Sequence, residues 1–184
     1  MGFESIVGGL VVVASFMLLV TITFGTLMYY QLSTQEAYKT ILDVESRYVS
    51  TNIKIENATI LENVTATSNT IKFNITIHNV GSTTLNLNYG NEILLDLPLV
   101  INGTTYVREV EFLIYGKDWN VTKIIAPNGV IYSGYSLPPE WKAEIVGYVE
   151  YPINYMLKDG GVVVIVFSTT YGFSTEYLTV YSGG

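Results

Sequence analysis

Five asparagines in this 184-residue chain have the spacing of acceptors for N-linked glycans. A threonine stands two positions after each one, and the residue between them is not proline, which is the pattern that is glycosylated in exported proteins. All five acceptors follow residue 50, and they are Asn57, Asn63, Asn74, Asn102 and Asn120. This cluster predicts that the chain beyond residue 50 lies outside the cell.

Residues that could support catalysis or metal binding are scarce. The chain has no cysteine and one histidine, His78, which excludes disulfides, cysteine nucleophiles and sites built from several thiolates or imidazoles. Glu109 and Glu111 lie on one face of an expected strand and could act as an acid and base, although solvated surface charge is the commoner role of glutamate. We therefore expect His78 to be a surface residue and the protein to be non-enzymatic, with no catalytic residue, metal or cofactor.

The charge balance narrows the range of partners. Sixteen acidic residues against nine lysines and arginines give a net charge of −7 at pH 7. Nucleic acids and anionic lipid headgroups both attract basic surfaces, because their phosphates are negative. The composition therefore argues against a nucleic-acid partner and against contact with an anionic membrane surface.

An uncharged run at residues 6–30 precedes all of these residues. A bilayer core of about 30 Å needs about 20 apolar residues in a helix, so the run predicts a single membrane span. Thr21, Thr23 and Thr26 can return their hydroxyls to the preceding turn, and Tyr29 and Tyr30 suit the membrane interface. A cleavable signal peptide fits less well, because the run is too long and no basic residue precedes it. A buried core helix would need a larger shell than the rest of the chain can build.

Helical periodicity continues beyond this span. Apolar residues recur at positions 37, 41, 44 and 48, which predicts a helical stalk. The favoured interpretation is that the stalk packs on the domain after it. The alternative is that its apolar side packs against other helices of an assembly. The predicted organisation is a transmembrane helix and stalk over residues 1–49 and an extracellular β-sandwich domain over residues 50–184.

Alternation of apolar and polar residues predicts the strands of this domain. The clearest strand is residues 71–78, in which Ile, Phe, Ile and Ile face one way and polar residues face the other. Asn102-Gly103 between two apolar runs predicts a type I′ hairpin turn, and Pro98 in the first run predicts an edge or bulged strand. Residues 162–167 are apolar throughout, which is typical of a central strand between two layers. Short strands separated by frequent turns predict a β-sandwich.

Aromatic residues are concentrated in the last third of the chain. Large amphipathic rings favour protein interfaces, although tyrosine is also a common strand residue. We expect an interaction surface that uses aromatic residues of the loops. The candidates are Tyr135, Trp141 and Tyr171.

A hydrophobic N-terminal helix that leads into an immunoglobulin-like sandwich without cysteine resembles the archaeal type IV filament superfamily, which includes archaellins, archaeal pilins and archaellum accessory proteins. Residues 75–85 are similar to the strand, Asn-x-Gly turn and strand found across that superfamily. Met1-Gly2-Phe3 with Ser5 before the apolar run is similar to the archaellum accessory protein F family. The resemblance implies a monotopic stator component of the archaellum whose sandwich contacts the S-layer, with other archaellum or filament subunits as further partners.

Two details favour such an accessory protein over a filament subunit. Archaeal prepilins usually carry a basic residue and a glycine directly before the apolar helix, whereas Gly2 here follows Met1. Glu4 does not match the glutamate that bacterial-type pilins place at the fifth position of the mature chain, if cleavage follows Gly2. We therefore expect an unprocessed, single-pass membrane protein with its C-terminal domain outside the cell.

Two other functions stay open. In the first, the protein is a filament-forming archaellin or type IV pilin whose helix packs with other copies in a filament core. Both an anchor and a filament subunit could form homo-oligomers. In the second, it is a membrane-tethered enzyme or ligand-binding module, for which the sequence supplies no candidate residue.

Overall fold

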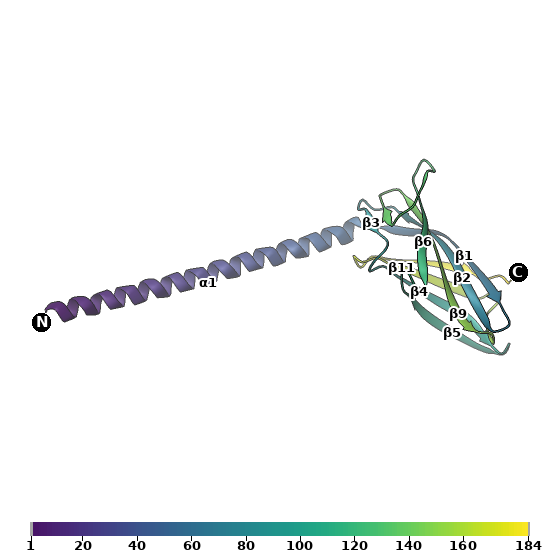
Figure 1. Cartoon of the computed structure of the whole chain (residues 1–184), viewed down its shortest axis with the longest axis horizontal. Coiled ribbons are helices and arrows are strands. Elements are labelled where there is room, and N and C mark those ends of the chain that lie inside the picture. The colour runs from purple at the N-terminus through teal and green to yellow at the C-terminus, as the bar shows by residue number, and fades with distance from the viewer. Residues whose placement is uncertain (1, 184) are drawn as a thin grey trace. The chain divides into compact units, whose positions relative to one another are not determined.

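The computed structural model describes residues 2–183, with side chains described from residue 8 onward. The chain divides into two compact units, Met1–Ser46 and Arg47–Gly184. The first unit is helical. Within the described residues, the second unit contains twelve strands arranged in three antiparallel sheets (Figure 1). The predicted fold class, one long apolar N-terminal helix followed by an all-β sandwich, is confirmed.

The single long helix is α1 (Gly2–Ser50), and no proline interrupts its backbone hydrogen bonds. The predicted bonds of its hydroxyls are confirmed, because Thr21, Thr23 and Thr26 each donate to the carbonyl four residues earlier at 2.7–2.8 Å. Side chains at residues 8–49 are exposed. Among the described residues, this is one helix that is long and apolar enough to cross a membrane.

Two larger sheets form the sandwich, and we call them sheet A and sheet C. Sheet A has the strand order β1-β2-β9-β6-β7, with β1 (Ile53–Val64), β2 (Ser68–Asn79), β6 (Trp119–Ile125), β7 (Ile131–Tyr132) and β9 (Lys142–Pro152). Sheet C has the order β10-β4-β11-β12 with β5 on the other side of β4, and its strands are β4 (Glu92–Ile101), β5 (Thr105–Leu113), β10 (Tyr155–Leu157), β11 (Val162–Ser168) and β12 (Ser174–Val180). A short pair of strands, β3 (Leu85–Asn86) and β8 (Ser136–Leu137), makes a third sheet.

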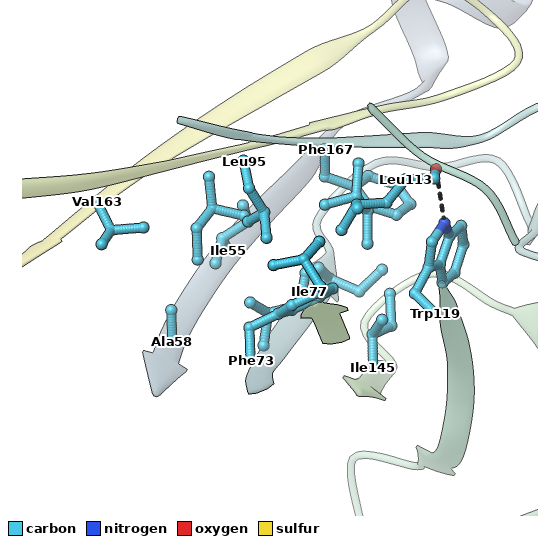
Figure 2. Close-up of a cluster of buried hydrophobic side chains, with 14 of the residues drawn as sticks. Ile55, Ala58, Phe73, Ile77, Leu95, Leu113, Trp119, Ile145, Val163 and Phe167 are labelled. Carbon is cyan, nitrogen blue, oxygen red and sulfur yellow. Dashed lines mark hydrogen bonds between the residues drawn. The ribbon is translucent and has the colours of Figure 1, made fainter. Parts of the chain in front are cut away.

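The core fills the space between the inner faces of sheets A and C. Phe73 and Ile77 of β2 extend from sheet A toward Leu95 of β4 and Phe167 of β11, as Figure 2 shows. The indole nitrogen of Trp119 is buried and donates to the carbonyl of Leu113 at 3.1 Å, so the largest core residue has no unsatisfied polar atom. Burial of such side chains stabilises a fold by about 1.5–3 kcal/mol each.

The hairpin between β4 and β5 has the predicted turn. Asn102 and Gly103 have φ values of 52° and 69°, and the amide of Thr104 donates to the carbonyl of Ile101 at 3.1 Å. Both central residues of a type I′ turn need positive φ, which asparagine and glycine tolerate best. This part of the prediction is confirmed.

Pro98 lies neither in an edge strand nor at a bulge of the β4–β5 ladder, so the prediction of an edge or bulged strand is wrong. β4 pairs with β5 on one side and with both β10 and β11 on the other. Pro98 falls between the residues paired with β11, which end at Asp96, and those paired with β10, which begin at Leu99. Its carbonyl accepts from the amide of Lys158 at 2.9 Å, so its imide nitrogen faces the same interrupted side and no ladder hydrogen bond is lost.

The strand expected over residues 85–89 is shorter than its alternation suggested. β3 ends at Asn86, because Gly90 with a φ of 67° turns the chain and the side-chain amide of Asn91 donates to the carbonyl of Asn86 at 2.8 Å. The amide of Leu87 bonds to the carbonyl of Tyr135 at 2.8 Å. Tyr89 is left exposed beside this turn.

Candidate interaction surfaces

The outer face of sheet A is polar. Outward positions of β2 alternate with its buried isoleucines and phenylalanine, and cross-strand pairing places Asn74 and Asn120 on either side of Val146. All five predicted glycan acceptors are exposed: Asn57 and Asn63 on β1, Asn74 on β2, Asn120 on β6, and Asn102 at the tip of the β4–β5 hairpin. Whether these residues carry glycans stays a prediction.

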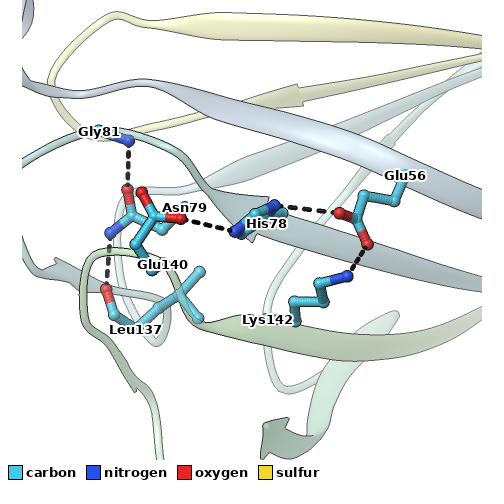
Figure 3. Close-up of polar contacts among 7 residues, drawn as sticks. All are labelled: Glu56, His78, Asn79, Gly81, Leu137, Glu140 and Lys142. Carbon is cyan, nitrogen blue, oxygen red and sulfur yellow. Dashed lines mark hydrogen bonds and ion pairs between the residues drawn. The ribbon is translucent and has the colours of Figure 1, made fainter. Parts of the chain in front are cut away.

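Ion pairs at one end of this face include the single histidine (Figure 3). His78 is half-buried, with its Nδ1 3.0 Å from Glu56 and its Nε2 3.6 Å from Glu140. The Nζ of Lys142 is 2.6 Å from the other oxygen of Glu56, and this bond is the main reason why the pKa of Glu56 lies below its ordinary value. These contacts join β1, β2 and β9. They give His78 a structural role beyond that of an isolated surface residue.

The Asn-x-Gly turn after β2 is a buried polar junction. Asn79 is fully buried, and its side-chain amide donates to the carbonyls of Thr83 and Leu137 at 2.8 and 2.9 Å. Its side-chain oxygen accepts from the amide of Gly81 at 3.1 Å (Figure 3). A Cβ on Gly81 would lie 2.5 Å from the backbone of Ser50 and Asn52, so only glycine fits. The turn therefore fixes the segment that leads into β1.

Sheet C has an apolar outer face, which we call the apolar face. Its outward side chains include seven that are between 39% and 68% exposed: Tyr106, Val110 and Phe112 of β5, Met156 of β10, Val162 of β11, and Leu178 and Val180 of β12. Leu94 of β4 and Val164 and Val166 of β11 lie between them and are half-buried. Cross-strand pairing joins these residues into continuous rows across the sheet.

β11 is central within its sheet, as its sequence predicts, but only one of its faces is covered. Val163, Ile165 and Phe167 are fully buried in the core. Val162 on the opposite face is 39% exposed, so within the described part of residues 47–184 no second layer covers it. The expectation of a layer on both sides of residues 162–167 is therefore wrong.

One ion pair lies within the apolar face. The Nε of Arg108 donates to Asp96 at 2.8 Å, and its Nη2 donates to the carbonyl of Val162 at 3.3 Å. The bond to Asp96 is the main reason why the pKa of Arg108 is raised. Because Arg108 and Asp96 neutralise each other, the centre of the face needs no charge from a partner.

A groove of about 690 Å³, lined by residues 88–92 and 112–115, lies beside this face. Tyr115 lies in it and makes edge-to-face contacts with Tyr89, Trp119 and Tyr135, at centroid distances of 6.3, 5.0 and 5.7 Å. Burial, aided by the neighbouring Tyr135 hydroxyl, raises the pKa of Tyr115 to about 12. The chain of rings therefore runs from the core to the exposed Tyr89.

The structure brings together two of the three predicted interface residues. Tyr135 and Tyr171 line one groove of about 340 Å³, which shares Asn88 with the larger groove. Tyr171 is half-buried against the core, and the guanidinium of Arg47 lies 5.9 Å from its ring centroid. Trp141 lines neither of these grooves. It packs on Tyr132 with 5.0 Å between centroids. A role for the three residues in binding stays a prediction.

Tyrosine–glutamate hydrogen bonds close both edges of the sandwich. The hydroxyl of Tyr151 in sheet A donates to Glu111 of β5 at 2.9 Å, and burial together with Glu111 raises the pKa of Tyr151. At the other edge, the hydroxyl of Tyr181 donates to Glu62 of β1 at 3.1 Å, and burial together with Glu62 raises the pKa of Tyr181 to about 12. Glu111 thus joins the two sheets. Within the described residues, no group of three acidic or histidine side chains could hold a metal ion.

The sequence analysis did not predict that Phe112, Leu178 and Tyr89 are exposed. A signal for the first was present in β5, where the outward set Tyr106, Arg108, Val110 and Phe112 has one charged residue and the inward set has two, Glu109 and Glu111. The pairing of β5 with β4 was needed to tell which set faces outward.

Comparison with known proteins identifies likenesses in structure. No family model matches the sequence, and no curated protein matches it. A subunit of the archaeal flagellum of Methanospirillum hungatei is 15% identical, with a TM-score of 0.58 over 99% of this chain and 96% of that one. The archaellum periplasmic stator complex of FlaF and FlaG from Sulfolobus acidocaldarius is 21% identical, with a TM-score of 0.45 over 69% of this chain and 87% of that one. The stator protein FlaG from the same organism is 21% identical, with a TM-score of 0.43 over 70% and 99%.

The flagellar subunit shares the fold of this chain over helix and sandwich together. The predicted likeness is therefore confirmed for the fold, which this chain shares with a subunit of an archaeal flagellum.

Proposed function

We propose that this protein is a non-enzymatic structural component of an archaellum, held in the cell membrane by α1 with its sandwich outside the cell. The observation that carries the proposal is the shared fold, a long N-terminal helix followed by a β-sandwich, which the flagellar subunit has in common with this chain over 99% of its length. The uncharged part of α1 up to Tyr30 has the length that a bilayer core requires. All five exposed glycan acceptors lie on the sandwich, which fits an extracellular domain.

Within this function we assign the protein to the anchor, or stator, with the S-layer as the partner of its sandwich. The resemblance of the sequence to the accessory protein F family supports this role. Charged residues Glu36, Lys39 and Asp43 follow the apolar part of α1, so its second half suits water better than a filament core. The groove lined by Tyr135 and Tyr171 is our candidate for the S-layer contact, because exposed aromatic rings favour interfaces.

Binding to isolated S-layer sheets tests the anchor. Residues 47–184, which form a compact unit, should co-sediment with the sheets, and Tyr135→Ala should weaken binding by about 30-fold if the ring is a hot spot worth about 2 kcal/mol. Tyr148→Ala on the outer face of sheet A is the matched control, since Tyr148 is 47% exposed and Tyr135 is 46% exposed. No co-sedimentation of the unaltered domain would remove the S-layer from the proposal.

A filament subunit is the second candidate function. The observation that favours it is the flagellar subunit itself, whose likeness covers the whole chain. Filaments sheared from cells should contain little of this protein if it is an anchor, because an apolar helix needs the bilayer or an equivalent apolar environment. Filaments made mainly of this chain would establish the subunit and end the anchor proposal.

A further inference from the structure

We propose that N-linked glycans on Asn57 and Asn63 shield the free edge of sheet A and prevent other extended segments from pairing with β1. This inference goes beyond the proposed function and depends on it only for the position of the sandwich outside the cell. Its starting point is the place of β1 in the sheet. Among the described strands β1 pairs with β2 alone, whereas β2 pairs with both β1 and β9.

The unpaired edge of β1 is a template for association. Free amides and carbonyls of an edge strand can pair with another strand, and proteins prevent this with charged side chains, prolines, bulges or a covering segment. β1 is twelve residues long, whereas most strands have about five or six, so the exposed edge is long as well. β1 also contacts β12, the strand at the end of sheet C, so two edge strands meet on this side of the sandwich.

Protection by the chain's own residues covers only the two ends of β1. At the start, the register with β2 shifts just before Asn57, so Glu56 lies in a bulge. Near the other end, Glu62 points inward, and its carboxylate accepts from the amide of Leu157 at 2.8 Å and from the hydroxyl of Tyr181 at 3.1 Å. An inward charge on an edge strand discourages strand addition, because an added strand would bury it further.

The middle of β1 has no such protection. Residues 57–61 are uncharged and contain neither proline nor glycine, which is the composition of segments that readily pair with other strands. Leu61 in this segment is 62% exposed. By contrast β5, which pairs with β4 alone, carries Arg108, Glu109 and Glu111 and contains no glycan acceptor. On these two edge strands the acceptors therefore occur where charges are missing.

The two acceptors of β1 are placed to shield this uncharged segment. Asn57 pairs with Thr76 and Asn63 pairs with Thr70, and both threonines alternate with buried residues of β2, so the two asparagines point outward. Six residues separate the acceptors, which corresponds to about 20 Å at about 3.4 Å per residue. Glycans are bulky and solvated, so one at each end of the segment leaves little room for an incoming strand.

The modification needs an asparagine amide and a sugar that is activated by a phosphate carrier. The amide nitrogen forms a bond to C1 of the sugar, the bond between C1 and the phosphate oxygen breaks, and the amide gives up one proton. The side chain stays neutral, so a glycan adds bulk and hydration to β1 without adding a charge.

The first test compares variants that lose equal numbers of acceptors. The full chain is made in an archaeal host that attaches N-linked glycans and is purified in detergent. Asn57→Gln with Asn63→Gln should form higher-order species about fivefold faster than the unaltered chain in sedimentation or light scattering, because the edge is then bare. The matched control combines Asn74→Gln, on a strand that is paired on both sides, with Thr104→Ala, which removes the acceptor Asn102 in a turn. Equal effects of the two pairs would show that the glycans act as general solubilisers, and the proposal would fail.

Mass mapping of the unaltered chain separates this proposal from the proposed function. Glycans should be found on Asn57 and Asn63. Bare Asn57 and Asn63 beside an occupied Asn74 would end the proposal, although the sandwich would still lie outside the cell. A chain without any glycan would end it as well and would count against the extracellular position, whereas binding to the S-layer is measured independently.

A charge in place of the glycans tests the mechanism of shielding. In the variant without acceptors on β1, Leu61→Lys should restore the slow association, because an exposed lysine protects an edge strand. Tyr148→Lys is the control, since Tyr148 is 47% exposed but lies on β9, which pairs with β2 and β6. Amides of residues 57–61 should exchange with solvent more slowly once the unshielded variant associates. Unchanged exchange there, or equal rescue by both lysines, would mean that association uses another surface and would overturn the proposal.

Discussion

The outer faces of sheets A and C differ in chemistry although both belong to one sandwich. Sheet A presents glycan acceptors and the Glu56–His78–Lys142 ion pairs, whereas sheet C presents Phe112, Leu178 and their neighbours. Both sheets need apolar residues on their inner faces, so only the outward positions are free to vary. The difference shows that the core determines the inward half of each strand, while the outward half can differ between the two sheets.

The largest effect should distinguish the two faces of β11. Val163 is fully buried and Val162 is 39% exposed, although they are adjacent. Val163→Asp should destabilise residues 47–184 by about 4 kcal/mol or more, because a buried carboxylate has no partner there. Val162→Asp should cost less than about 1 kcal/mol, as expected for a partly exposed position.

Urea unfolding followed by tryptophan fluorescence measures both variants. Trp119 lies in the core and reports its loss. Equal destabilisation by the two substitutions would mean that the outside of sheet C is covered within a single chain, and the contrast between the outer faces would be lost.

A second, smaller effect should separate two asparagines of β2. Asn79→Ala removes side-chain hydrogen bonds to Thr83, Leu137 and Gly81 and leaves buried backbone groups without partners, so we expect a loss of about 2–3 kcal/mol. Asn74→Ala changes an exposed acceptor on the same strand and should cost less than about 0.5 kcal/mol. Thermal unfolding of residues 47–184 provides the comparison. Similar losses for both variants would mean that the Asn79 junction contributes little to stability.

Much of sheet A could be predicted from local sequence. The alternation over residues 71–78 identifies β2 and its inner face, because a strand has a period of two whatever its neighbours are. One turn of sheet C, Asn102-Gly103, was equally local, since its backbone conformation depends on those two residues.

Sheet C was less predictable because its features depend on pairing between distant strands. Pro98 is compatible with an inner strand only because β10 and β11 meet beside it, and no local pattern contains that information. An apolar run such as residues 162–167 cannot tell a second layer of the same chain from a surface that a partner covers. The ring contacts of Tyr115 with Tyr89 and Tyr135 likewise depend on three segments that are far apart in sequence.

The smallest effect concerns the ion pairs of sheet A and their dependence on pH. Lys142 holds the pKa of Glu56 below its ordinary value, so the folded state binds a proton at Glu56 less readily than the unfolded state does. The stabilisation by this pair is therefore fully present above the unfolded pKa of Glu56 and is lost as pH falls through the folded pKa. Lys142→Met should cost about 0.5–1 kcal/mol at pH 7, the range for partly exposed pairs, and nothing once Glu56 is protonated.

The measurement is the difference in unfolding free energy between residues 47–184 with and without Lys142→Met, followed from pH 7 downward. His78 also contacts Glu56, but it is present in both proteins, so its direct effect largely cancels in the difference. Lys117→Met is the control, because the Nζ of Lys117 is 3.5 Å from Asp118 and its side chain is 75% exposed, which predicts almost no change at any pH. A cost for Lys142→Met that stays constant into acid would show that the ion pair with Glu56 is not the source of the cost, since methionine keeps most of the aliphatic stem of lysine.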